Sequence, residues 1–226
     1  MTNVSAPLKV KIRNFLRRTA IKELEKQGHQ VERIPRAGKG SLRKITKDGV
    51  SQTVTIRTSQ DTWIAFPRNA NDTGWSTLED ADLVLAASLD EKGGRYANFH
   101  LMDADDIRAR FDRARAARLR ANHVMPAERG IWISLYNQEA DEPVSMVGAG
   151  AGLKYPAFAK NIPVLLDHQM DSVATEGDGE DEPPVPPPAL APSAPDDGPL
   201  TIPEAKRRLA LAFGVDPGAI KIIVEG

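Results

Sequence analysis

Three arginines have a spacing that could place positively charged groups side by side. If residues 103–121 form a helix, Arg110, Arg113 and Arg120 fall within one arc, because a helix turns by about 100° per residue. The apolar residues of this segment are Ile107, Phe111 and Ala114, and we expect them to face the core on roughly the opposite side. A row of guanidinium groups can contact the phosphates of a nucleic acid. The alternative is an ordinary solvated helix face.

A second set of candidate phosphate contacts lies in the first third of the chain. Residues 1–70 contain fifteen basic and five acidic residues, whereas residues 170–200 contain eight acidic residues and no basic one. A basic surface attracts polyanions, and an acidic segment can compete for it. Four residues of the basic part are selected as candidates: Lys39, Arg43, Lys44 and Arg57. Lys39 lies in a glycine-rich stretch that could approach a phosphate backbone closely.

The remaining reactive residue types form no strong pattern. The chain has no cysteine, which excludes disulfides, a thiol nucleophile and thiolate metal sites, and which suits a reducing cytoplasm. The four histidines lack metal-ligand spacing, and His100 is expected to be structural. The glycines of residues 148–152 lack the spacing of a phosphate-binding loop, so this segment is expected to be flexible. We therefore expect no cofactor and no bound metal.

Two features of the sequence bear on location. Residues 1–8 do not combine a charged start with an apolar run, so no signal peptide is expected. No stretch approaches the ~20 consecutive apolar residues that a membrane span requires. We expect a cytoplasmic protein without a membrane partner.

An alternation of helices and strands must position these candidates. The expected helices are residues 9–27 and 103–121, the second with Asp103 as its N-cap. The expected strands are residues 29–34, 41–46, 50–58, 63–66, 81–87, 96–102 and 130–136. Asp48-Gly49 predicts a tight hairpin turn, and residues 63–66 are expected to continue the same sheet. The fold class is therefore α/β, with a mixed central sheet flanked by helices, and residues 137–170 have no predicted order.

The order of helix, strand, loop, hairpin and apolar strand resembles the PD-(D/E)XK nuclease superfamily, especially its Mrr-like and resolvase-like members. The resemblance covers roughly residues 9–120. It rests on the hairpin of residues 41–50, on the strand that ends Arg57-Thr58-Ser59, and on the strand-to-helix step at residues 99–103. The resemblance implies a restriction-endonuclease-like core.

The same resemblance identifies three motif positions. In the family, one acid opens the second strand, while a second acid or glutamine and a lysine lie two residues apart on the third strand. The carboxylates hold a divalent metal and the lysine helps to activate water. The matching residues in this chain are Ser41, Thr55 and Arg57. Serine and threonine supply no negative ligand and arginine stays protonated, so the resemblance implies a degenerate, non-catalytic site.

The C-terminal quarter has a different composition. Residues 171–199 read as an acidic, proline-rich linker that follows a core of residues 1–170. Residues 200–226 read as a helix and a strand, with Thr201 and Glu204 at the spacing of a capping box. One helix and one strand are too few to fold alone, so this module is expected to dock on a larger surface.

Three functions are compatible with these observations. The first is a non-enzymatic protein that binds nucleic acid, with DNA as the expected partner, without reading its sequence. The second is an adaptor that docks a protein partner through residues 200–226. The third is an active metal-dependent nuclease whose acids have moved, for example to Glu32 and Asp48.

Overall fold

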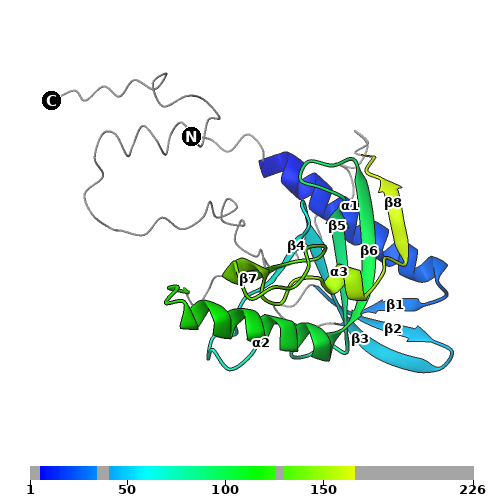
Figure 1. Cartoon of the computed structure of the whole chain (residues 1–226). Helices are drawn as coiled ribbons and strands as arrows, with labels where there is room; N and C mark the ends of the chain where they lie inside the picture. The colour runs from blue at the N-terminus through cyan, green and yellow to red at the C-terminus, as the bar shows by residue number, and fades with distance from the viewer. Residues whose placement is uncertain (1–5, 35–40, 126–129, 166–226) are drawn as a thin grey trace, which may run out of the picture. The chain divides into compact units, whose positions relative to one another are not determined.

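The computed structural model describes residues 6–34, 41–125 and 130–165 (Figure 1). The helices are α1 (Ala6–Lys26), α2 (Ala104–Arg120), α3 (Ala151–Lys154) and the 3-10 helix η1 (Val144–Met146). The strands are β1 (Gln30–Arg33), β2 (Leu42–Lys47), β3 (Val50–Ser59), β4 (Trp63–Phe66), β5 (Leu83–Leu89), β6 (Tyr96–Asp103), β7 (Ile131–Ser134) and β8 (Ala159–Pro163). The expected linker and the C-terminal module lie outside the described residues.

Six of the strands form one mixed sheet in the order β1-β2-β3-β5-β6-β8. Strands β3 and β5 are parallel, and every other neighbouring pair is antiparallel. The prediction of an α/β protein with a mixed central sheet is therefore confirmed. Within the described residues, no helix is both long and apolar enough to cross a membrane.

Strand β4 does not continue this sheet, and that prediction is wrong. Residues 63–66 are extended, but they pair with β7 in a separate two-stranded sheet, with Ile64 opposite Ile133. The chain turns away from β3 at Asp61, whose carboxylate accepts hydrogen bonds from the Ser59 hydroxyl and the Trp63 N–H, both at 2.8 Å. This turn carries the apolar side chains of β4 over the face of the central sheet, where they are buried.

Each face of the central sheet packs against its own helix. On one face, Leu16, Ala20 and Leu24 of α1 pack with Val54 and Ile56 of β3. Because side chains alternate along a strand, Thr55 and Arg57 point to the other face. That face is covered by α2 and by the β4–β7 ribbon (Figure 1).

Local sequence signals explain two of these elements. Asp48 and Gly49 have positive φ angles of 51° and 81°, as a two-residue hairpin turn requires, so the predicted hairpin is confirmed. The N–H of Asp106 donates to the Asp103 carboxylate at 2.9 Å, which confirms Asp103 as the N-cap of α2. Residues 137–165, which had no predicted order, contain η1, α3 and the edge strand β8.

Candidate functional site

The three motif positions lie next to one another on the face of the sheet that α2 covers. Ser41 immediately precedes β2, and its carbonyl accepts a hydrogen bond from the N–H of Ile56 at 2.9 Å. The Thr55 hydroxyl lies 3.5 Å from the Ser41 hydroxyl and 3.3 Å from the Thr77 hydroxyl. Arg57 also donates to the Thr77 hydroxyl. We call Ser41, Thr55, Thr77 and Arg57 the hydroxyl–arginine cluster.

Arg57 is held inside the protein. Its guanidinium donates to the carbonyl of Ser76 at 3.3 Å and lies 4.3 Å from the ring centre of Phe66. Only 5% of Arg57 is exposed. It therefore lies too deep for the phosphate contact that the sequence suggested, because the aromatic ring and the chain at residues 76–77 enclose it.

Thr77 was not singled out from the sequence. Its φ angle is +62°, which is rare for a β-branched residue and costs on the order of 1–3 kcal/mol. This conformation places the Thr77 hydroxyl between Thr55 and Arg57, and Thr77 is fully buried. No local sequence signal predicts a left-handed threonine, so the fourth member of the cluster could only be found in the structure.

Helix α2 holds the segment that covers this cluster. Arg108 donates to the carbonyl of Leu78 at 2.6 Å, and Arg115 pairs with Asp72 at 2.6 Å. The Trp75 indole donates to Asp112 at 2.8 Å. These contacts fasten residues 67–81 to the outer helix, so the hydroxyl–arginine cluster is closed on that side.

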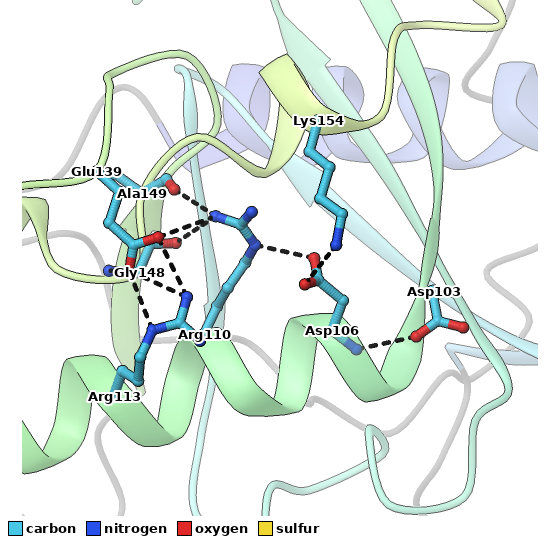
Figure 2. Close-up of polar contacts among 8 residues, drawn as sticks. All are labelled: Asp103, Asp106, Arg110, Arg113, Glu139, Gly148, Ala149 and Lys154. Atoms are coloured by element: carbon cyan, nitrogen blue, oxygen red, sulfur yellow. Dashed lines mark hydrogen bonds and ion pairs between the residues drawn. The ribbon is translucent and has the colours of Figure 1, made fainter.

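The expected arginine stripe on α2 is used mostly within the protein (Figure 2). Arg110 is buried and pairs with Asp106 at 2.9 Å and with Glu139 at 3.7 Å, and it also donates to the Ala149 carbonyl. Arg113 makes two hydrogen bonds of 3.1 Å to Glu139. Arg110 therefore cannot serve as the phosphate contact expected from its spacing, because the segment that includes Ala149 packs over it. Arg120 is exposed in the last turn of α2.

Asp106 is the acid that joins two cations in this network. Burial alone would raise the pKa of its carboxyl group, but hydrogen bonds from Lys154 at 2.7 Å and from Arg110 outweigh that effect. The pKa of Asp106 therefore lies below its ordinary value. The network joins α2, α3 and Glu139 and leaves Asp106 fully ionised at neutral pH.

The glycine-rich segment of residues 148–152 is packed, and its expected flexibility was wrong. The N–H groups of Gly148, Gly150 and Gly152 donate to the Glu139 carboxylate, the Ser134 carbonyl and the Leu135 carbonyl, respectively, at 2.8–3.0 Å. A Cβ at Gly148 would lie 2.5 Å from the carbonyl oxygen of Arg110. The glycines therefore permit close packing on α2, and their N–H groups have no capacity left for a phosphate.

The two remaining candidates on β2 do not form one surface. Arg43 is half-buried and donates to the carbonyl of Leu42 at 2.8 Å. Lys44 is exposed, with its Nζ 3.9 Å from Glu32. Adjacent residues on a strand point to opposite faces, so Arg43 and Lys44 face different sides of the sheet. Lys39 lies outside the described residues.

A second buried polar cluster surrounds His100. The imidazole Nδ1 lies 2.7 Å from the Tyr155 carbonyl, and Nε2 lies 2.8 Å from the Tyr136 hydroxyl. Because a carbonyl only accepts, Nδ1 carries the proton, and in the neutral ring Tyr136 donates to Nε2. The hydroxyl of Ser88 and the amide of Asn98 each lie 3.4 Å from the Tyr136 oxygen. Asn98 and His100 share a face of β6, which is the sequence signal that could have revealed this cluster.

His100 predicts a loss of stability in mild acid. Burial lowers the pKa of His100 below 6.5 despite the opposing effect of the Tyr155 carbonyl. As pH falls below 6.5 the unfolded chain binds the proton first, so folding stability decreases by up to about 1.4 kcal/mol per pH unit for this group. The pKa of His29 is also lowered, first by burial and then by Lys47, and adds in the same direction.

The measurement is the fall in melting temperature between about pH 7.5 and about pH 5.5. His100→Gln should reduce this fall relative to the wild-type chain, and His29→Gln should remove a separate part of it. The comparison uses the difference between the two pH values, since losing the His100 hydrogen bonds lowers stability at every pH. An unchanged fall in the His100→Gln chain would contradict the assignment.

Comparison with family models, with curated proteins and with solved structures finds no match for this chain.

Proposed function

We propose that this protein binds nucleic acid without cleaving it, through a domain with a degenerate nuclease-like site. One observation carries the proposal: Ser41, Thr55 and Arg57 meet on one face of the sheet, as the metal-binding residues of a PD-(D/E)XK nuclease would, but they carry no carboxylate. The antiparallel β2–β3 hairpin is followed by the parallel strand β5. This arrangement is compatible with the order of hairpin and apolar strand on which the resemblance rests.

The residues at the motif positions do not fit the divalent metal that such a nuclease needs. Mg²⁺ prefers carboxylate oxygens, whereas Ser41, Thr55 and Thr77 offer neutral hydroxyls that already contact each other. The fixed positive charge of Arg57 lies beside them and would repel a cation. Because this donor set disfavours a metal, we assign no metal-dependent step to it.

Relocated acids receive no support as an alternative. Across residues 6–34, 41–125 and 130–165, no three His, Cys, Asp or Glu side chains gather in a way that could hold a metal ion. The acids considered for such a role are both exposed, Glu32 on β1 and Asp48 in the turn between β2 and β3. Glu32 instead lies near Lys44.

The charge distribution supports a nucleic acid as the partner. The excess of ten positive charges in residues 1–70 is concentrated in α1 and in β1–β3. Phosphate contacts from such a surface give affinity without sequence specificity, and nonspecific binding of this kind typically has a Kd of about 10⁻⁴–10⁻⁶ M.

The absence of catalysis is directly testable. Purified full-length protein is expected to leave plasmid DNA and single-stranded RNA intact in the presence of Mg²⁺ or Mn²⁺, because the motif positions cannot hold either ion. Parallel reactions with EDTA separate metal-dependent cleavage from contamination by metal-independent nucleases. Cleavage that copurifies with the protein, stops with EDTA and persists in a repeat preparation would overturn the non-catalytic assignment.

A further inference from the structure

The N-terminal part of α1 is unusual in its charge. Residues 6–22 contain six basic residues and no acidic residue: Lys9, Lys11, Arg13, Arg17, Arg18 and Lys22. The acids of this helix, Glu23 and Glu25, both lie in its last turns. The helix therefore has a cationic part followed by a mixed part.

This distribution opposes the helix dipole. The N-terminal end of a helix carries a partial positive charge, so acids stabilise it and bases destabilise it. Helix α2 follows the rule, with Asp105 and Asp106 in its first turn and Arg118 and Arg120 in its last. Helix α1 has no acid in its first turn. Of its bases only Lys9 lies in that turn and adds to the positive potential of the helix end, while the other bases act through their own charge.

The cations of the two helices also differ in what they contact. On α2, five arginines donate to acids or carbonyls of the protein: Arg108, Arg110, Arg113, Arg115 and Arg118. On α1, the side chains of Arg13, Arg18 and Lys22 make no hydrogen bond or ion pair with any residue, as far as the described chain extends. The donors of α2 are occupied, whereas these three on α1 are available to an anion.

The packing of α1 selects nucleic acid over a membrane. Leu16, Ala20 and Leu24 are buried against the sheet, so the apolar side of the helix is occupied by the protein core. At about 100° per residue, Arg18 and Lys22 lie on the opposite side, where Arg18 is partly exposed and Lys22 is exposed. Arg13 lies on the same side as the buried residues, so it does not share this surface. A helix that binds a bilayer from its surface must insert its apolar side, which α1 cannot do without unpacking. Phosphates on a nucleic acid backbone need only the exposed cations.

The geometry points to residues 6–22 of α1 as the surface that contacts the nucleic acid phosphates, in place of the α2 arginines. This inference rests on the proposed function and specifies where binding occurs. It assigns Arg18 and Lys22 to direct phosphate contacts.

The test is a salt titration of binding by the full chain, with a fluorescent duplex DNA of mixed sequence as the probe. For B-DNA, log Kobs falls with log salt by about 0.9 per phosphate contacted. The variant Arg18→Gln/Lys22→Gln should therefore show a slope shallower by about 2, and at low salt its affinity should fall by several-fold or more. Its melting temperature should stay close to that of the wild-type chain, because neither side chain makes a hydrogen bond or ion pair within the described residues.

A matched control removes the same charge elsewhere. Lys92 and Arg95 are exposed on the β5–β6 turn, and Lys92→Gln/Arg95→Gln should bind like the wild-type chain. Equal weakening in both double variants would overturn the inference, since only net charge would then matter. An unchanged slope in the α1 variant, with loss of binding in Arg120→Gln, would overturn it in favour of α2.

Two further outcomes separate this inference from the function on which it rests. If the wild-type chain does not bind duplex DNA or RNA at low salt, the proposed function itself fails. If it binds vesicles containing phosphatidylserine through α1 but binds no nucleic acid, the partner assigned here is wrong. If the wild-type chain binds DNA and the α1 variant binds equally well, only the location is wrong.

Discussion

Replacing Arg110 with alanine is expected to lower the free energy of unfolding by about 3–5 kcal/mol, the cost of breaking a buried ion pair from one side. The lower end of this range applies, because Glu139 is 38% exposed and solvent screens its charge. The substitution leaves Asp106 with Lys154 alone and removes a donor from the carbonyls of Gly148 and Ala149. Urea denaturation followed by circular dichroism measures the loss.

Arg113→Ala provides the matched control. Arg113 pairs with the same acid, Glu139, but it is 48% exposed, so its removal should cost no more than about 1 kcal/mol. A loss of stability in Arg110→Ala with unchanged DNA affinity would support a structural role for Arg110. If Arg110→Ala instead kept its stability and bound DNA more weakly, the phosphate-contact role expected from the sequence would be restored.

The parts of the fold that the sequence predicted correctly are those with local causes. Asp48-Gly49 supplies the two positive φ angles of the hairpin, and Asp103 supplies the acceptor that begins α2. The apolar run that became β5 is buried on both faces, so its composition alone identified it. In each case a few neighbouring residues determine the conformation, and no distant contact is needed.

The parts that were missed depend on contacts between distant segments. Strand β4 has a strand-like sequence, but its partner is β7, about 65 residues later, and nothing in residues 63–66 identifies that partner. The sequence interpretation grouped Arg110 with Arg113 and Arg120. At 100° per residue, however, Arg110 lies about 40° from Ala114 and so belongs to the arc of buried residues of α2. The segment that covers this arc, at residues 148–149, could not be identified from the helix alone.

The candidate site was predicted only in part from the sequence. The resemblance selected Ser41, Thr55 and Arg57, and the structure brings them together, but it also encloses them through Thr77. The excess of positive charge was evident from composition. The composition did not show which basic side chains can bind another molecule. This depends on the contacts that each side chain makes within the folded protein.

The measurement that tests the central claim most directly is the salt dependence of DNA binding by the full-length protein. If Arg18 and Lys22 contact one phosphate each, raising salt from about 50 to about 200 mM should weaken binding about 12-fold, and more if other basic residues take part. The same samples, incubated with Mg²⁺, should contain uncut DNA. No binding at low salt, or an affinity that does not change over this range, would contradict the claim that this protein binds nucleic acid through its basic surface.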